Sequence, residues 1–458
     1  MMDNVWLHTK KSILWDPIIN EFQKKGVWEK VIRRTKRPSL EEIKKLKKEI
    51  TLPREDSERY DLSYEKLLKQ QFSILDMFLR KTDWGSDRYN SASIHELSSR
   101  IRIYYEFYTL SLTKENISLV IFYNTPHMGW DTILYEAAKN LKIKTLILDQ
   151  SNFSNKFFHS FVLHDFGTFK TSRILDHTQH YQIEKKFEKD WFYMKKNRWK
   201  KEPLSLKKLI TLSKYKKRIN HFIEGNDYLR LIREIASKNR RSQSFFRFYT
   251  EINYKKELKK ITTTQYSIKK KYVYFPLHFQ PEKVSSVWTG IYIDQVLAIE
   301  RLSNIIPSDW FIYVKENPKQ RGAYRSNLFF ERLKLIPNLL FLSRKANTFE
   351  LTRNSQFVAT IVGSVGWEAI TGGKNVLLFG WGAWYKNLPG VYKYRQDLDV
   401  NELLTQKIDH KLLEKNVAKI YNKCGTGIIF DAYIPSITDF SIEKNTITVF
   451  DSIKRILY

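Results

Sequence analysis

The sequence predicts an α/β protein, and three observations lead to this fold class. Five apolar runs of strand length alternate with helical segments between residues 269 and 440, which is typical of a doubly wound α/β domain. Residues 119–148 predict a strand, a helix and a second strand, and such a unit indicates another parallel sheet. The chain of 458 residues is long for one domain and sufficient for two.

The strands of the later domain are predicted at Tyr272–Leu277, Trp310–Val314, Leu339–Leu342, Phe357–Ile361 and Asn375–Phe379. Between the first two runs lies a helix with one apolar side. In doubly wound folds, ligands bind at the carboxyl ends of the strands. The loops that follow these strands are therefore the candidate site.

The first part of the chain contains an apolar run at Val5–Leu7 and a long, charged helical stretch up to residue 110. Its two clear strands are predicted at Leu119–Tyr123 and Thr145–Leu148. The helix between them carries an apolar stripe formed by Ile133, Leu134, Ala137, Ala138 and Leu141.

These patterns divide the chain into four parts. Residues 1–165 form an N-terminal Rossmann-like domain, 166–268 a basic helical insertion, 269–440 a C-terminal Rossmann-like domain, and 441–458 a helix that we expect to pack back on the first domain. The segment 195–218 mixes Lys and Arg with apolar residues. It predicts either a solvated helical hairpin or a surface for anionic lipid or a charged glycan.

The composition indicates an anionic partner. Lys plus Arg number 79 against 49 Asp plus Glu, a formal net charge of +30, which favours nucleic acid, a membrane surface or an acidic substrate. The one cysteine, Cys424, excludes an intrachain disulfide and a multi-cysteine metal site. The N-terminus does not resemble a signal peptide and no window predicts a membrane span. We therefore expect a cytoplasmic protein, with peripheral attachment to the inner membrane left open.

The loop after the fourth strand of the later domain predicts an anion site. Gly363, Ser364 and Gly366 lie where a strand ends and a helix begins, so main-chain N–H groups and the helix dipole favour a phosphate. Glu368, in the first turn, can accept a hydrogen bond from a ribose hydroxyl. The alternative is an ordinary tight turn, with Glu368 a favourable partner of the dipole.

The loops after the first two strands carry further polar groups. Lys315 would supply positive charge to a phosphate, and Asn317 a neutral donor. Gln280 and Glu282 would face the same rim if their strands are neighbours. A solvated loop is the alternative for Lys315 and Asn317.

The first domain has a matching feature after Leu119–Tyr123. His127 and Asp131 can stand at the top of its sheet, facing a cleft, where either could take a proton from an acceptor hydroxyl. The alternatives are a helix cap for Asp131 and a structural loop residue for His127. Known metalloprotease and zinc-cluster patterns are absent from the sequence, and we predict no metal site.

The strings FPLHFQPE, VKENPKQRG and ATIVGSVGWEAITGGKNVLLFG resemble bacterial capsule polysaccharide biosynthesis proteins, which include Kdo transferases of capsule and lipopolysaccharide assembly. The stretch TPHMGWDTILYEAAKNLKIKT resembles the first-domain motif of that family. The resemblance implies a GT-B fold, in which two Rossmann-like domains face a cleft, here with the helical basic insertion added. It also implies a CMP-activated acidic sugar as donor, with neither a metal nor another cofactor.

The family motifs fall on particular residues of this chain. Its Gln-Pro motif falls on Gln280, and its His-Pro motif falls on Asn317, where asparagine replaces the histidine expected to contact the nucleotide phosphate. Its glycine loop falls on Gly363–Ala369, which is expected to hold the cytidylate. His278, Glu282 and Tyr385 are assigned to the donor or acceptor sugar.

The sequence therefore predicts a glycosyltransferase that moves Kdo or a nonulosonic acid from a CMP-activated donor to an anionic glycan or a lipid-linked acceptor. Asp131 is the first choice for general base if the reaction inverts, and His127 the second. We expect no nucleic-acid partner. Two alternatives stay open: a CDP-polyol phosphotransferase of similar fold, and a non-catalytic protein that binds anionic polymers.

Overall fold

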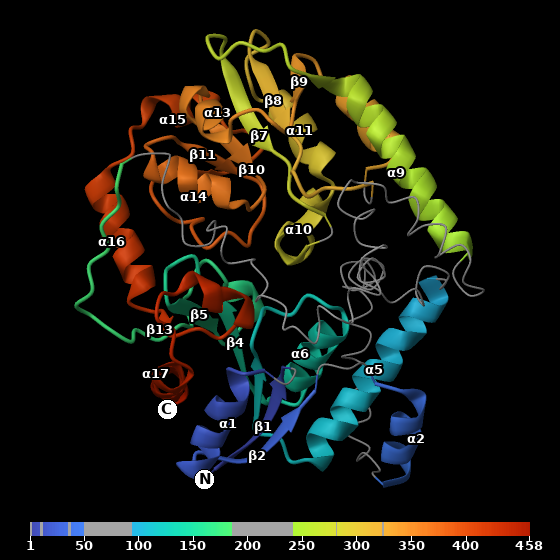
Figure 1. The fold of residues 1–458 in the computed structure, drawn as a ribbon, viewed down its shortest axis with the longest axis vertical. Coiled ribbons are helices and arrows are strands. Elements are labelled where there is room, and N and C mark those ends of the chain that lie inside the picture. Colours follow the sequence, from blue (N-terminus) through green and yellow to red (C-terminus); the bar gives the residue numbers. More distant parts are fainter. Residues whose placement is uncertain are drawn as a thin grey trace, which may run out of the picture.

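The computed structural model describes residues 2–9, 12–34, 38–49, 94–185, 241–280, 282–322 and 325–458. These residues form two α/β units, each built around one sheet. Figure 1 shows the units stacked along the long axis, with both chain termini at the first unit.

The first sheet has the strand order β13-β5-β4-β3-β1-β2. The pairs β1–β2, β1–β3 and β3–β4 are parallel, whereas β5 pairs antiparallel with both β4 and β13. The strands are β1 (Asp3–His8), β2 (Trp28–Arg33), β3 (Leu119–Phe122), β4 (Lys144–Gln150), β5 (Lys156–Ser160) and β13 (Gly425–Thr426).

Both faces of this sheet are buried. Along β3, Leu119 and Ile121 enter one apolar cluster, whereas Val120 and Phe122 enter another on the opposite face, as the two-residue period of a strand requires. Such continuous apolar strands are typical of parallel sheets covered on both sides. The first cluster includes α1 and α17, and the second includes α5 and α6. The helices of this unit are α1 (Trp15–Lys24), α2 (Leu40–Glu49), α5 (Ile94–Lys114), α6 (Trp130–Asn140) and α17 (Ile442–Leu457).

The second sheet has the order β12-β11-β10-β7-β8-β9-β6, and its paired strands are parallel. Its strands are β6 (Thr262–Thr263), β7 (Tyr272–Pro276), β8 (Phe311–Lys315), β9 (Leu339–Leu342), β10 (Val358–Thr360), β11 (Val376–Leu378) and β12 (Val391–Lys393). From β7 the chain proceeds to β8 and β9 on one side, and then to β10 and β11 on the other. The topological switch point therefore lies between β7 and β10, where ligands of doubly wound sheets bind.

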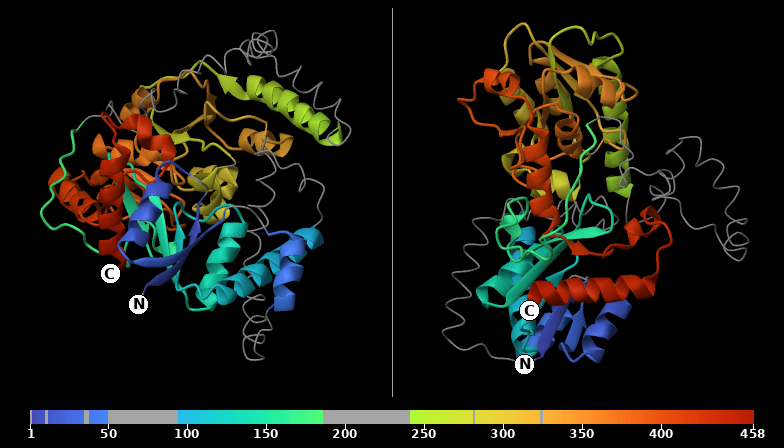
Figure 2. Two further views of the ribbon diagram at one scale, coloured as in Figure 1. Left: turned by 60° about the horizontal axis from the view of Figure 1, so that its bottom comes forward. Right: turned by 90° about the vertical axis from the view of Figure 1, so that its left-hand side faces the viewer.

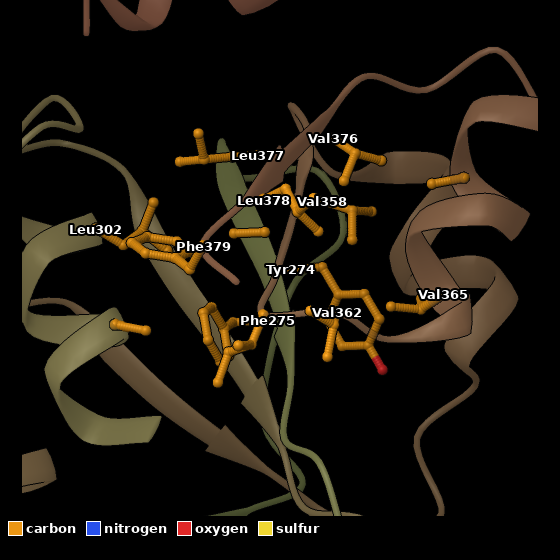
Figure 3. Close-up of a cluster of buried hydrophobic side chains, with 14 of the residues drawn as sticks. Tyr274, Phe275, Leu302, Val358, Val362, Val365, Val376, Leu377, Leu378 and Phe379 are labelled. Atoms are coloured by element: carbon orange, nitrogen blue, oxygen red, sulfur yellow. The ribbon is translucent and has the colours of Figure 1, made fainter. Parts of the chain in front are cut away.

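Helices flank the second sheet and complete its core. Figure 3 shows Tyr274 and Phe275 of β7 in a cluster with apolar side chains of β10, β11 and neighbouring helices. The helices are α9 (Arg241–Ile261), α10 (Lys283–Val287), α11 (Gln295–Ser303), α12 (Asn327–Lys334), α13 (Thr348–Asn354), α14 (Ser364–Thr371), α15 (Val400–Thr405) and α16 (His410–Tyr421).

The chain returns to the first unit before its end. Residues Gly425 and Thr426 of β13 pair with β5 of the first sheet, so the return comes earlier than the predicted boundary at residue 440. The following helix, α17, lies against the first unit (Figure 2), and its Val449 and Ile453 join the same cluster as α1.

The predicted α/β class with two largely parallel sheets is confirmed. Each strand predicted between residues 119 and 379 is present, with its ends within two residues of the expectation. The sequence did not predict β2, β5, β6, β12 and β13. β2 and β12 are only partly buried, β6 and β13 have two residues each, and β5 is buried but contains Lys, His and Ser, which leave no apolar run. The basic segment 195–218 lies outside the described residues. Within those residues, no helix is both long enough and apolar enough to span a bilayer.

Packing of α17 should stabilise the first unit. Ile453 is fully buried, and Ile447 on the same helix is 52% exposed. We predict that Ile453→Ala lowers the free energy of unfolding by about 2–5 kcal/mol, because a buried cavity forms. The control Ile447→Ala should change it by less than about 0.5 kcal/mol. Urea unfolding followed by tryptophan fluorescence measures both, and equal effects would contradict this packing.

Candidate functional site

The carboxyl-terminal edges of the two sheets face one another. Lys283, the first residue of α10 after β7, reaches across to the first unit. Its Nζ lies 2.6 Å from Asp149 Oδ2 at the end of β4 and 2.8 Å from Asn124 Oδ1 in the loop after β3. Thr125 donates its hydroxyl to the same Asp149 oxygen at 2.6 Å. The strand-end loops of both units therefore meet at one place.

An aromatic contact lies beside this ion pair. Phe166, just after the first sheet, stacks on Trp288 of the second unit with ring centroids 4.4 Å apart. Lys386 donates to the Phe166 carbonyl at 2.9 Å and to the Trp381 carbonyl at 2.8 Å. Burial lowers the pKa of Lys386 to about 8. These contacts fix the position of one unit against the other.

The Gly363 loop opens α14 at the switch point of the second sheet. Gly363 is the N-cap and provides no side-chain cap. The Gly363 N–H donates to Thr360 Oγ1 at 3.2 Å and the Gly366 N–H to the Gly363 carbonyl at 3.1 Å, so an anion at this helix start would use the N–H groups of Ser364 and Val365. Ser364 is exposed at the helix start. The structure thus puts a helix N-terminus at the edge where the sequence predicted a phosphate.

His278, after β7, lies against this loop. Its Nε2 is 3.3 Å from Thr360 Oγ1 and accepts from the Val362 N–H at 3.4 Å. A Cβ on Gly363 would approach the imidazole to 3.1 Å, so glycine is needed for this close packing. Burial, together with the charge of Arg325, lowers the pKa of His278 to about 4. The ring is therefore neutral at pH 7.

Tyr385 shapes the glycine loop from below and is fully buried. Its hydroxyl donates to the Gly363 carbonyl, and a Cβ on Gly366 would collide with the Tyr385 ring and hydroxyl. Burial, with a further contribution from Glu368, raises the pKa of Tyr385. Tyr385 therefore supports the loop, and Glu368, 4% exposed, lies in the interior near it.

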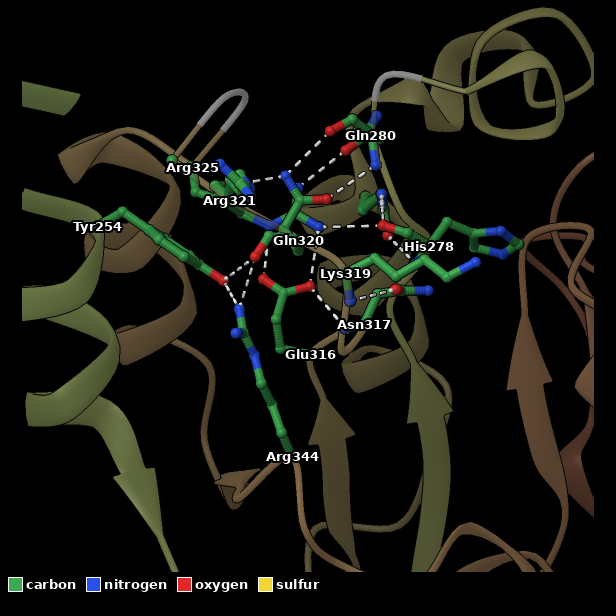
Figure 4. A network of polar contacts seen from close by, with 12 residues as sticks. Tyr254, His278, Gln280, Glu316, Asn317, Lys319, Gln320, Arg321, Arg325 and Arg344 are labelled. Atoms are coloured by element: carbon green, nitrogen blue, oxygen red, sulfur yellow. Dashed lines mark hydrogen bonds and ion pairs between the residues drawn. The ribbon is translucent and has the colours of Figure 1, made fainter. Parts of the chain in front are cut away.

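Gln280 belongs to a buried polar network (Figure 4). Arg325 forms a bidentate ion pair with Glu316, with both side chains fully buried, at 2.8 Å from Nε to Oε2. It also donates to Gln280 Oε1 at 2.9 Å and to the His278 carbonyl at 3.2 Å. Gln280 and Gln320 exchange main-chain to side-chain bonds of 2.8 and 3.0 Å. This network fixes the loops after β7 and β8 to each other.

Lys315 and Asn317 lie at the end of β8 and in the loop after it, and both make contacts within the second unit. Lys315 Nζ donates at 2.7 Å to both the Ala346 carbonyl and Thr348 Oγ1, and burial lowers its pKa. The Asn317 side-chain oxygen accepts from the Lys319 N–H at 3.0 Å. Lys315 is thus directed at α13, and Asn317 closes a local turn.

Glu282 begins α10. Its N–H donates to Ser285 Oγ at 3.2 Å, and the same hydroxyl donates to the Phe279 carbonyl at 2.7 Å. These contacts start the helix that carries Lys283, so Glu282 helps to direct Lys283 at the first unit.

Asp131 and His127 lie together in the loop that opens α6. The Asp131 carboxylate accepts three main-chain N–H groups, from His127 at 3.0 Å, Met128 at 2.7 Å and Thr132 at 2.8 Å. Its side chain is 2% exposed, against 22% for His127. His127 Nδ1 lies 2.7 Å from the Thr125 carbonyl, which assigns the proton to Nδ1 and leaves Nε2 as the basic nitrogen. The geometry gives Asp131 the contacts of a structural cap, the alternative that the sequence left open.

Sequence reasoning assigned no role to Asp149, Lys283, Glu316 or Arg325. Asp149 had a signal, since it is an acid directly after the buried strand of the first domain. Lys283 follows the Gln-Pro string without a pattern of its own. The Arg325–Glu316 pair joins residues 9 positions apart in an irregular segment, which no period or motif predicts.

The fold and the facing edges define a two-unit α/β protein with a candidate anion site at a switch point. A family model described as "Capsule polysaccharide biosynthesis protein" matches residues 172–424, more than half of the chain. The chain therefore belongs to the family of capsule polysaccharide biosynthesis proteins.

Several solved structures are similar to this chain. The β-Kdo 2,7 transferase KpsC of Thermosulfurimonas dismutans is 10% identical, with 98% of this chain and 99% of that chain covered and a TM-score of 0.36. The UDP-GlcNAc 2-epimerase of Methanocaldococcus jannaschii is 14% identical, with 92% and 99% covered and a TM-score of 0.27. The calicheamicin glycosyltransferase CalG4 is 8% identical, with 100% of each chain covered and a TM-score of 0.22. No curated protein sequence gives a significant match.

The buried pair of Arg325 and Glu316 should dominate the stability of the site. We predict that Arg325→Met lowers the free energy of unfolding by about 3–5 kcal/mol, because Glu316 is left as an uncompensated buried charge. The control is Arg395→Met, which removes an exposed partner of Glu402 and should cost less than about 1 kcal/mol. Denaturant unfolding compares the two variants, and similar losses would show that the buried pair has no special weight.

Proposed function

We propose that the protein is a glycosyltransferase of capsule polysaccharide assembly, which transfers an acidic sugar, Kdo or a nonulosonic acid, from a CMP-activated donor to a glycan or glycolipid acceptor. One observation carries the proposal. The uncapped N-terminus of α14 opens at the switch point of the second sheet, on the edge that faces the first sheet across the contact between Lys283 and Asp149. Membership of the capsule family supports the polysaccharide context.

The nucleotide phosphate would bind at the start of α14. The N–H groups of Ser364 and Val365 would contact it, because those of Gly363 and Gly366 donate to Thr360 Oγ1 and to the Gly363 carbonyl. The two glycines would permit close approach, and the helix dipole adds positive potential where the leaving phosphate gains charge. A monophosphate leaving group needs less charge compensation than a diphosphate, so we propose a reaction without a metal. His278 supports the loop as a neutral ring. Glu368 lies beyond the first turn of α14 and is buried, so it does not supply the ribose contact that the sequence predicted.

The remaining predicted residues would shape the donor pocket. Gln280 and Asn317 hold the two loops beside the phosphate, and Lys315 fixes the start of α13. Glu282 orients α10, and Tyr385 holds the glycine loop in place through its bond to the Gly363 carbonyl. Each of these roles acts through the position of the main chain.

The acceptor would enter from the first unit. We propose His127 as the general base, because it is the more exposed of the two candidates and its Nδ1 donates to the Thr125 carbonyl, which sets the tautomer with the lone pair on Nε2. Asp131 would hold the His127 loop through its three main-chain contacts. A lipid-linked acceptor would place the reaction at the cytoplasmic face of the inner membrane, with the basic segment 195–218 as the proposed contact.

A thermal-shift panel with CMP, CDP, UDP and GDP tests the nucleotide. CMP should raise the melting temperature most, and saturation at 100 times Kd corresponds to about 2.7 kcal/mol. Gly366→Ala should lose this shift, because its Cβ would collide with Tyr385. A larger shift with UDP or GDP would contradict a cytidine donor.

The panel is followed by assays that separate the alternatives. CMP-Kdo and CDP-glycerol must each be tested alone, since transfer from either donor releases CMP. Release from CDP-glycerol only would identify a polyol-phosphate transferase. Equal, strongly salt-dependent shifts with all nucleotides and no CMP release would identify a binder of anionic polymers.

His127 gives the test of the acid–base step. We predict that His127→Ala lowers kcat by about 10²–10⁴-fold while the Kd for CMP stays unchanged, because only proton transfer is lost. Asp131→Asn should have a smaller effect, since it loosens the loop without removing the base. Single-turnover assays measure both variants, and a larger loss in Asp131→Asn would return the base role to Asp131.

A further inference from the structure

We propose that Lys283 recognises the carboxylate of the acidic donor sugar and that it exchanges Asp149 for this carboxylate when the donor binds. The inference rests on the proposed function and adds a specificity-determining residue to it. The group recognised is the carboxylate of the donor sugar, and Lys283 is a side chain of the second unit that reaches the first unit between the facing edges.

Lys283 has the position that this role requires. It belongs to the second unit, seven residues after β7 ends, and its ammonium group lies at the strand ends of the first unit, 2.6 Å from Asp149 and 2.8 Å from Asn124. A donor held by its phosphate at α14 would extend its sugar toward the first unit. The sugar would therefore pass the Lys283 ammonium group.

Three other cations at this edge have fixed structural partners. Arg325 is committed to the buried Glu316, and Lys315 donates to the Ala346 carbonyl and Thr348. Lys386 donates to two main-chain carbonyls. Lys283 differs from them because its side chain is 17% exposed and its partner in the other unit is a carboxylate, Asp149.

The exchange keeps one carboxylate on Lys283, and the donor adds one negative charge to the site because Asp149 stays in place. Lysine has a flexible stem that permits such a movement. Asp149 would keep the Thr125 hydroxyl at 2.6 Å and the Thr125 N–H at 3.4 Å. A cavity beside Asp149 measures about 10 Å³, which is room for a single water. This cavity is lined by the first unit and does not hold a sugar, so a donor would approach the ion pair from the side of Lys283, which is 17% exposed.

Trp288 adds a second donor to the same cluster. Lys283 Nζ lies 4.8 Å above the Trp288 ring, so the ring supports the ammonium group on one side. Trp288 is 7% exposed, and its indole N–H has no acceptor within the part of the chain that the structure describes. A sugar oxygen would accept a hydrogen bond from this indole N–H. A buried N–H group without an acceptor costs free energy.

Calorimetry with CMP and CMP-Kdo tests the inference on the full-length chain. Wild type should bind CMP-Kdo more tightly than CMP, and Lys283→Met should reduce this preference roughly tenfold or more, because a charge-assisted contact is lost. The Kd for CMP should stay unchanged, which also shows that the variant is folded. Lys283→Arg keeps the charge and should retain most of the preference.

Asp149→Asn gives an effect of opposite sign. It removes the competing carboxylate and keeps an oxygen for Thr125, so the preference for CMP-Kdo over CMP should rise by about three- to tenfold. The matched control is Lys270→Met, since Lys270 also lies over an aromatic ring, Phe311 at 4.5 Å, but at the opposite edge of the second sheet. This control should leave both affinities unchanged.

Three results would overturn the inference while leaving the proposed function intact. They are equal binding of CMP and CMP-Kdo by wild type, equal weakening of both ligands by Lys283→Met, and a lower preference for CMP-Kdo in Asp149→Asn. Wild type that binds neither cytidine compound would overturn the proposed function itself.

Discussion

The candidate site depends on one buried ion pair, between Arg325 and Glu316. A guanidinium group without water must place its donors on fixed acceptors, and here these are the Glu316 carboxylate, Gln280 Oε1 and the His278 carbonyl. The loops after β7 and β8 therefore have one arrangement relative to each other. His278 follows from it, because its main chain is held by the network while its ring extends away (Figure 4) to Thr360 and the glycine loop. The bond from Arg325 to the His278 carbonyl therefore helps to set the position of α14 against β7, because the ring of the same residue packs on the glycine loop.

The second constraint is the path of the chain, which leaves the first unit and later returns to it in the part of the chain that the structure describes. Residues after Leu163 leave the first sheet beside Phe166, and the chain returns at β13, which pairs with β5. The edge strand beside β5 is β13, which follows the second unit in the sequence, so the first sheet is completed by a segment that comes after the second unit. Stacking of Phe166 on Trp288 and the contacts of Lys386 join the units between these two points of the chain. Two facing edges are consequently held at a defined separation, which a transfer reaction between them requires.

Much of this arrangement is predictable from the sequence, and the remainder is not, for physical reasons. Apolar runs such as Leu339–Leu342 must be buried, so the strands and the edge that carries the loops follow from local pattern. The turn at Gly363 and Gly366 is also predictable, because two glycines between a strand and a helix indicate a close approach of the main chain. The contacts of Asp131, Lys283 and Tyr385 depend on partners distant in the sequence or on main-chain groups, which leave no periodic signal. The sequence consequently gave Asp131 a catalytic role where the structure shows three main-chain N–H groups at its carboxylate.

The character of the charges at the site explains how a strongly basic protein can be selective among anions. With a formal net charge of +30, long-range attraction will bring many polyanions to the surface. At the switch point itself, however, His278 is neutral, Asn317 has no charge, and Arg325 and Lys315 are engaged in fixed contacts. A phosphate there would be bound by oriented main-chain dipoles, which require close approach and correct geometry, whereas a cluster of mobile cations would accept any polyanion. The asparagine at position 317 fits this design, since it keeps a turn closed without adding a charge. In the proposed site, Lys283 then selects among anions, because it is already paired with Asp149. A ligand must replace Asp149 to bind Lys283, and only an anion of the right shape and length does so.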